Sequence, residues 1–204
     1  MLDAAGVERA HVYGVSLGGV VVQQLALEAP ERVLSLVLGC TGILTDDKPR
    51  APRILNLLLR LPRSVKLAMG RSGYGSAAPA DRIAKDQDVL RAEVTVLQSL
   101  IAQQDALRAY AVSREQVATL TMPTLVLHGT QDRLVRLAWG QELAEVLPDA
   151  RLITYEGAGH NYLVAAGDRA NADVLEFLAD VDRLTGRLFS FWCRSGGLRV
   201  ASRA

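Results

Sequence analysis

The sequence predicts an α/β fold in which about four parallel strands are flanked by helices and interrupted by a helical insertion. Apolar stretches of strand length alternate with helical patterns before residue 41 and again after residue 122. Such continuously apolar strands are typical of a parallel sheet that is covered on both faces. Between these two parts, helical patterns rich in leucine dominate. We therefore expect a core in two parts over 1–41 and 122–186, a helical cap over 42–121, and a C-terminal tail over 187–204.

Composition and charge favour one globular domain and exclude several classes of protein. The chain has 204 residues, 50% of them hydrophobic, and a net charge of +1, which gives no reason to expect nucleic acid or a membrane as a partner. Its 2 cysteines make no disulfide framework, so a reducing, cytoplasmic compartment is expected. No apolar run of about 18 residues occurs, and residues 1–6 lack the features of a signal peptide. The histidines and cysteines are too scattered to predict a metal site.

The first part is predicted to form one βαβ unit. Its elements are the end of a helix, a strand, a helix and a second strand, over residues 2–6, 10–13, 17–29 and 33–39. Gly6 is typical of a helix end, and Pro30 lies just beyond the helix that joins the strands. Four apolar residues of that helix recur at helical spacing: Val20, Val21, Leu25 and Ala26. The crossover between the two strands is expected to be right-handed.

The middle part is predicted to be helical throughout. Helices are expected over 52–61 and 63–69 and, in two or more pieces, within 81–112, with a loop rich in glycine and serine over 71–79. One helical face carries Val94, Leu97, Leu100 and Ile101. The leucines of this part either line a substrate pocket or pack the cap onto the core.

The α/β pattern returns after residue 122. We predict a strand over 123–129, a helix over 137–147, a strand over 150–155 and a final helix over 172–184. The apolar face of the final helix comprises Val174, Leu175, Leu178 and Val181.

A serine lies at the junction between the first strand and the following helix. Gly14, Ser16 and Gly18 form the pattern G-x-S-x-G. A strand that turns at once into a helix holds the serine hydroxyl clear of the backbone, in a strained conformation. Glycine is expected on both sides because side chains would collide in so tight a turn. The N–H of Leu17, at the start of the helix, can then face a developing oxyanion.

Two further residues are candidates to activate Ser16. A serine hydroxyl is a poor nucleophile unless an imidazole takes its proton and a carboxylate orients that imidazole. Asp132 and His160 each follow a predicted strand, so both should lie with Ser16 at the carboxyl edge of the sheet. Taken alone, Asp132 could instead be a turn residue or a helix cap, and His160 an ordinary loop histidine.

The remaining candidates have other interpretations. Asp46 and Asp47, in the loop after the second strand, are alternative positions for the acid. His11 and His128 lie within strands and are interpreted as structural. Cys40 ends a strand near the site and is interpreted as a small packing residue.

Four motifs together resemble the α/β-hydrolase superfamily: Gly14-Val15-Ser16-Leu17-Gly18-Gly19, Ala29-Pro30-Glu31-Arg32-Val33, Leu127-His128-Gly129-Thr130-Gln131-Asp132 and Glu156-Gly157-Ala158-Gly159-His160. They are most similar to its capped esterase, lactonase and cofactor-free haloperoxidase-like branch, over residues 2–184. The resemblance implies that Ser16 is the nucleophile, Asp132 the acid and His160 the base. Haloalkane dehalogenases and epoxide hydrolases carry an aspartate at the elbow, so Ser16 argues against both activities.

This sequence departs from the superfamily at its beginning. Members normally carry several strands before the elbow, and one early loop supplies a second oxyanion donor. The sequence begins just before the elbow strand, so we expect a truncated chain. The apolar edge of that strand would favour self-association.

The expected function is a serine hydrolase that cleaves a carboxylic ester, lactone or thioester of a small to medium apolar acyl compound. The reaction would proceed through an acyl-enzyme on Ser16, without a cofactor or metal. The alternative is a non-catalytic α/β-hydrolase-like binding module, or an inactive fragment.

Overall fold

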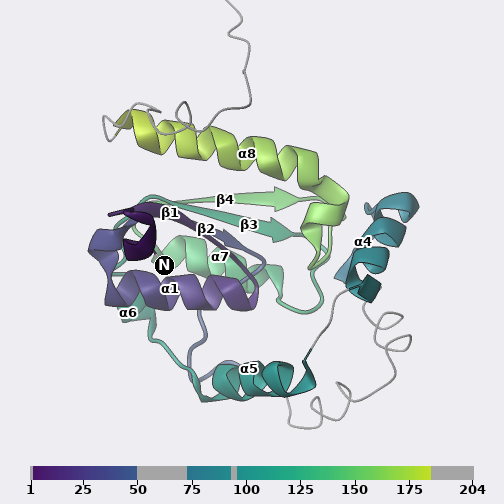
Figure 1. Ribbon diagram of the computed structural model, residues 1–204, viewed down its shortest axis with the longest axis horizontal. Coiled ribbons are helices and arrows are strands. Elements are labelled where there is room, and N and C mark those ends of the chain that lie inside the picture. The colour runs from purple at the N-terminus through teal and green to yellow at the C-terminus, as the bar shows by residue number, and fades with distance from the viewer. Residues whose placement is uncertain (1, 50–72, 93–95, 185–204) are drawn as a thin grey trace, which may run out of the picture.

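A parallel sheet of four strands forms the centre of the protein (Figure 1). The computed structural model describes residues 2–49, 73–92 and 96–184. The strands lie side by side in chain order and are β1 (Ala10–Val15), β2 (Val33–Gly39), β3 (Thr124–Gly129) and β4 (Ala150–Tyr155). All three strand pairs are parallel, as the apolar stretches predicted. Consequently the loops that follow the four strands meet at one edge of the sheet.

Helices cover both faces of this sheet (Figure 1). Within the described residues the helices are α1 (Leu17–Glu28), α4 (Ala80–Ala92), α5 (Leu97–Ala109), α6 (Arg114–Val117), α7 (Leu137–Val146) and α8 (Tyr162–Leu184), with short 3-10 turns over Asp3–Ala5 and Pro30–Arg32. Helices α1 and α7 lie on one face and α8 on the other (Figure 1). None of the described helices has both the length and the apolar character that crossing a membrane requires.

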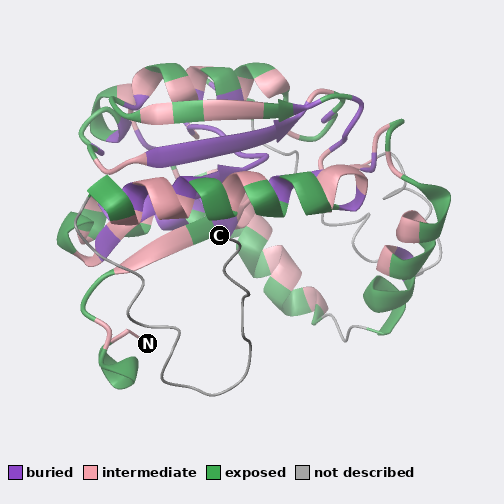
Figure 2. Ribbon diagram, turned by 90° about the horizontal axis from the view of Figure 1, so that it is seen from above, coloured by how far each residue is buried: buried purple, intermediate pink, exposed green. Residues whose placement is uncertain are grey.

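The two central strands are buried on both faces, as Figure 2 shows. Side chains alternate along a strand, so successive residues of β2 pack into two different hydrophobic clusters, one on each face of the sheet. Leu36 and Leu38 pack with α1 and α7, whereas Val37 packs with α8. In β3, Val126 belongs to the cluster on the side of α1 and α7, and Leu127 to the cluster on the side of α8. This double burial accounts for the continuously apolar sequence of both strands.

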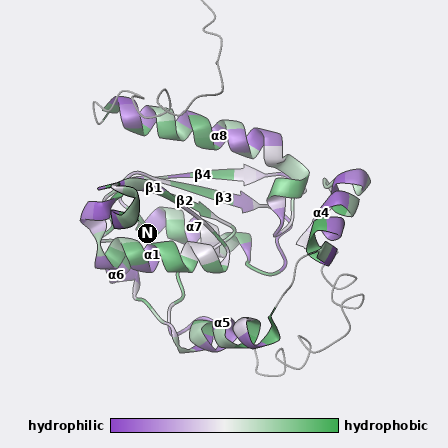
Figure 3. Cartoon of the chain, viewed as in Figure 1, coloured by the Kyte–Doolittle hydropathy of each residue, from purple (hydrophilic) through white to green (hydrophobic). Residues whose placement is uncertain are grey.

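The prediction of which α1 residues face the core was partly wrong. Val20 and Ala26 are buried, but Val21 is 58% exposed and Leu25 is also exposed. Helix α1 instead buries Gly19, Val20, Val22, Gln23 and Ala26. Four of these positions follow the spacing i, i+3, i+4, i+7, which places them on one stripe. Apolar residues colour much of α1 in Figure 3, so hydropathy does not distinguish this stripe from its neighbour.

The final helix is longer than predicted. It begins at Tyr162 rather than near residue 172, and non-helical backbone at Ala166 divides it into two pieces. Leu175 is 63% exposed, whereas Phe177 is buried against the sheet. The shorter prediction followed the clearly periodic piece beyond the kink.

In the middle part of the chain, α4 and α5 confirm the helices expected within 81–112. Other predictions lie outside the described residues: the helices over 52–61 and 63–69, Val94 and the tail over 187–204.

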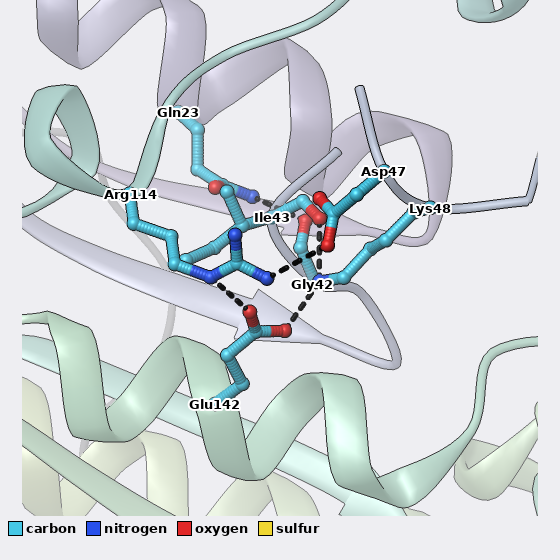
Figure 4. A network of polar contacts seen from close by, with 7 residues as sticks. All are labelled: Gln23, Gly42, Ile43, Asp47, Lys48, Arg114 and Glu142. Carbon is cyan, nitrogen blue, oxygen red and sulfur yellow. Dashed lines mark hydrogen bonds and ion pairs between the residues drawn. The ribbon is translucent and has the colours of Figure 1, made fainter. Parts of the chain in front are cut away.

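The loop after β2 is held in place by a network of charged groups (Figure 4). The buried ammonium of Lys48 donates to the carbonyl of Ile43 at 2.7 Å and pairs with Glu142 on α7. Glu142 also accepts a hydrogen bond from Arg114 Nε at 2.6 Å, and Arg114 pairs with Asp47. Burial would raise the pKa of Glu142, but the hydrogen bonds from Lys48 and Arg114 hold it below its ordinary value. The network therefore ties this loop to α6 and α7 through charges that are all paired.

Candidate active site

Ser16 lies at the junction between β1 and α1. Its backbone has a φ of 55° and a ψ of −119°, a conformation that a residue with a side chain rarely adopts. Backbone hydrogen bonds hold it there: its N–H donates to the carbonyl of Gly39 at 2.8 Å, and its carbonyl accepts from the N–H groups of Gly19 at 3.0 Å and Val20 at 3.4 Å. The strained turn from strand to helix predicted for this serine is present.

The two glycines of the motif do not have the same reason to be there. A Cβ atom on Gly14 would lie 2.3 Å from the carbonyl oxygen of Gly18, so Gly14 is required as predicted. A Cβ atom on Gly18 would meet no atom within 4 Å other than the adjoining backbone of its own helix, so the predicted collision at that position is wrong. The second crowded glycine is Gly19, where a Cβ atom would lie 2.6 Å from the Thr41 side chain. Gly18 already belongs to α1 and its Cβ position opens outward, which is why the tight turn does not crowd it.

His160 and Asp132 form a hydrogen-bonded pair at the carboxyl edge of the sheet. His160 Nδ1 lies 2.7 Å from Asp132 Oδ2. The other carboxylate oxygen, Oδ1, accepts from the N–H groups of Leu134 at 2.8 Å and Val135 at 2.9 Å. Because a carboxylate only accepts, the imidazole proton belongs on Nδ1 and the lone pair on Nε2. This is the tautomer that can take a proton from a serine hydroxyl.

The environment keeps Asp132 ionised. Burial of its side chain would by itself raise the pKa, but the bonds from His160 and from the two backbone amides lower it below its ordinary value. The Asp132 side chain is fully buried and that of His160 is 17% exposed. The pair therefore presents a charged acceptor inside the protein and an imidazole that reaches solvent.

The surroundings of Asp132, Asp46 and Asp47 differ. The turn interpretation of Asp132 is also correct, since Oδ1 bonds to backbone two and three residues later. It does not cap the following helix, where Arg136 holds the N-cap position. The alternative positions for the acid, Asp46 and Asp47, are both exposed, and Asp47 pairs with Arg114 instead of a histidine, so the geometry does not favour them.

The other two histidines are structural, as predicted. Buried His128 has Nε2 3.0 Å from the carbonyl of Val135, and burial lowers the pKa of its imidazole. It thereby supports the loop that carries Asp132. His11 lies at the opposite end of β1 from Ser16, where its ring nitrogens contact Ser35 Oγ at 2.7 Å and Asp182 Oδ1 at 3.2 Å. These contacts join β1 to β2 and α8.

Cys40 packs beneath the imidazole and carboxylate pair. It is fully buried and has a φ of 43°, immediately after β2. The Cys40 sulfur and one ligand atom each of Asp132 and His160 lie within 4.8 Å of one another. Burial raises the pKa of the thiol strongly, and His160 Nδ1 already bonds to Asp132. These features fit the predicted packing role better than they fit a metal ligand set.

Sequence reasoning missed several residues that hold the site together. The hydroxyls of Tyr13, on the elbow strand, and Tyr162, two residues after His160, lie 2.5 Å apart. Tyr162 also stacks on Tyr155, with ring centroids 5.4 Å apart. No local pattern could have indicated these contacts, because Tyr13 and Tyr162 are 149 residues apart in the chain.

Known hydrolases resemble this chain in sequence and in structure. The family model described as "Serine aminopeptidase, S33" matches residues 3–165. The curated "Putative carbamate hydrolase RutD" of Azorhizobium caulinodans is 31% identical over 195 residues, covering 90% of this chain and 71% of the relative. A 2-hydroxy-6-oxononadienedioate/2-hydroxy-6-oxononatrienedioate hydrolase of Pseudomonas sp is 29% identical over 189 residues, covering 88% and 66%. The solved meta-cleavage product hydrolase CumD of Pseudomonas fluorescens IP01 has 25% identity and a TM-score of 0.72, covering 88% of this chain and 68% of that chain.

Proposed function

Because the chain belongs to the family described as serine aminopeptidase S33, within the α/β-hydrolase superfamily, we propose that it is a serine hydrolase acting on carboxylic esters, lactones or thioesters. Ser16 is the nucleophile, His160 the base and Asp132 the group that orients His160. The observation that carries this proposal is the 2.7 Å hydrogen bond between His160 and Asp132. Both residues follow strands parallel to the one that ends at Ser16, so all three loops meet at one edge of the sheet.

In the proposed reaction, Ser16 Oγ attacks the substrate carbonyl carbon as His160 Nε2 takes the hydroxyl proton. The negative charge that develops on the carbonyl oxygen is stabilised by the N–H of Leu17. Leu17 is the first residue of α1, where backbone N–H groups have no acceptor within the helix. The leaving group departs with the proton from His160, and water activated by His160 then releases the acid from Ser16.

Within this proposal, the segment over 42–121, of which the structure describes 42–49, 73–92 and 96–121, is the predicted cap. Two observations support it. Helices α4 and α5 lie between β2 and β3 in the chain, and neither packs directly on the sheet: α4 stands beyond the ends of the strands, and α5 lies on the far side of α1 from the strands (Figure 1). The end of this segment also belongs to the hydrophobic core, since Val117 and Leu120 pack with the strands.

We propose a class of substrate rather than one particular compound. Curated relatives are named as a putative carbamate hydrolase and as a 2-hydroxy-6-oxononadienedioate/2-hydroxy-6-oxononatrienedioate hydrolase, names that refer to small molecules. A carbamate therefore belongs beside the esters, lactones and thioesters in any substrate screen.

Replacement of Ser16 by alanine tests the proposal. We expect Ser16→Ala to lower the rate of hydrolysis of the best substrate about 10⁴-fold or more, since the nucleophile is lost while the fold remains. A panel of p-nitrophenyl esters, a lactone, a thioester and a carbamate would be assayed. Ser99→Ala, at an exposed position of α5, is the matched control and should retain full activity. Full activity of Ser16→Ala would refute the proposal, and ligand binding without turnover in both chains would favour the non-catalytic alternative.

A further inference from the structure

The geometry points to Asp86, on α4, as a positioning residue for His160. Asp86 lies on the segment over 73–92, which we call the brace, between β2 and β3. The inference rests on the proposed function, because it concerns how the base of that reaction is held. The brace lies beyond the carboxyl ends of the strands, beside the start of α8 (Figure 1).

Backbone hydrogen bonds join the brace to the loop that carries His160. The N–H of Gly159 donates to the carbonyl of Tyr74 at 3.0 Å, and the N–H of Asn161 donates to the carbonyl of Gly73 at 2.9 Å. A third bond runs from the Ala77 N–H to the carbonyl of Gly157 at 2.9 Å. Two of these bonds lie directly on either side of His160, so the brace defines the path of the histidine loop.

The two segments approach so closely that only glycine fits at their contact. A Cβ atom on Gly75, which has a φ of +76°, would lie 2.3 Å from the Gly157 carbonyl oxygen. A Cβ atom on Gly159 would lie 2.4 Å from the Gly73 carbonyl oxygen. Backbone atoms on both sides occupy these places, so the register between brace and loop cannot shift without breaking contacts.

Asp86, on α4, joins the brace to the histidine loop through two hydrogen bonds. One oxygen of its carboxylate, Oδ2, accepts from the hydroxyl of Tyr74 at 2.8 Å and from Asn161 Nδ2 at 3.0 Å. A charged acceptor makes both bonds stronger than neutral ones. Asn161 is the neighbour of His160, so the carboxylate acts on the base through one residue. Asp86 is therefore a positioning residue and does not itself touch the reacting atoms.

The brace also contacts the loop that carries the acid. The N–H of Ser76 donates to Gln131 Oε1 at 2.8 Å, and the N–H of Gln131 donates to the carbonyl of Ala158 at 2.8 Å. Gln131 immediately precedes Asp132. The brace thus contacts the neighbours of both His160 and Asp132, and a displacement of α4 would disturb their pairing.

Substitution of Asp86 tests the inference with two readouts. Asp86→Ala should lower the rate at which a fluorophosphonate modifies Ser16 by about ten- to a hundredfold, with little change in the KM of an ester substrate. Amide hydrogen exchange at Gly159 and Asn161 should accelerate, while exchange in β3 stays unchanged. Asp86→Asn keeps an acceptor oxygen and should restore most of the rate. If Asp86 acted only through its negative charge or only through the overall stability of the protein, this rescue would not be seen.

The matched control is Asp88→Ala on the same helix, because exposed Asp88 pairs with Arg91 of its own helix. If Asp86→Ala does not fold, Tyr74→Phe removes one of the two bonds and keeps the buried ring. Equal rates and equal exchange in Asp86→Ala and Asp88→Ala would overturn the inference. A failure of the proposed function looks different: the unmodified protein would not react with the fluorophosphonate, while hydrogen exchange would still report on the brace.

Discussion

Asp132→Asn should lower the rate of ester hydrolysis about 10⁴-fold while leaving the fold intact. The asparagine Oδ1 can still accept from the N–H groups of Leu134 and Val135, so the loop keeps its shape. Its NH₂ group then faces His160 Nδ1, in place of the oxygen that lies there now. The imidazole must accept that bond at Nδ1 and carry its proton on Nε2, where it cannot take a proton from Ser16. The kcat on the best ester, together with a circular dichroism spectrum, measures the effect.

Asp47→Asn is the control for this prediction. It changes the alternative acid suggested by the sequence, which is exposed and pairs with Arg114. We expect it to retain at least half of the activity. The prediction would be refuted if the activity of Asp132→Asn stayed within tenfold of the unmodified protein, or if Asp47→Asn lost activity to the same extent as Asp132→Asn.

The same aspartate predicts a pH dependence of stability. The pKa of Asp132 is lower in the folded protein than its ordinary value of 3.8, so ionised Asp132 stabilises the fold above that pH. This contribution is lost as the pH falls through the lowered pKa. The difference in free energy of unfolding between the protein and Asp132→Asn should therefore shrink below about pH 4.

Gly14→Ala should destabilise the fold by about 3 kcal/mol or more, or prevent folding. The new Cβ atom would lie 2.3 Å from the Gly18 oxygen and 2.8 Å from the Gly19 nitrogen, which are backbone atoms of the first turn of α1. That turn cannot withdraw without moving Ser16. Urea unfolding followed by circular dichroism measures the change.

Gly18→Ala separates this explanation from the simpler one in which both motif glycines are needed. A Cβ atom there meets nothing within 4 Å beyond the adjoining backbone of α1, and alanine favours the helix over glycine by about 0.5–1 kcal/mol. We expect Gly18→Ala to be as stable as the unmodified protein or slightly more so. Equal losses of stability at positions 14 and 18 would contradict the steric explanation.

Much of the fold could be predicted from the sequence because two strands are continuously apolar and end at glycine or a polar loop. The bounds of β2 and β4 match their predicted ranges. The side chains that face the core were harder to predict. Val21 and Leu25 are apolar yet exposed, because hydropathy does not reveal how α1 is rotated against the sheet. The first piece of α8 lacks a clear apolar period and was missed for that reason.

The pairing of His160 with Asp132 could be predicted because an activated serine needs an imidazole held by a carboxylate, and because loops after parallel strands meet at one edge. The role of Ser16 as nucleophile stays a prediction. The contacts of Asp86 with Asn161 and Tyr74 could not be foreseen. They depend on how a segment between β2 and β3 folds back over a loop after β4, and such long-range hydrogen bonds leave no local pattern in the sequence.

The most direct test of the proposed function is the intact mass of the protein after incubation with a fluorophosphonate, beside that of Ser16→Ala. We predict one adduct on the unmodified protein and no adduct on the variant, because the reagent reacts with a serine that an imidazole activates. Fragmentation should place the adduct on Ser16. A folded protein that gains no adduct, or an adduct that persists in Ser16→Ala, would contradict the assignment of Ser16 as the nucleophile.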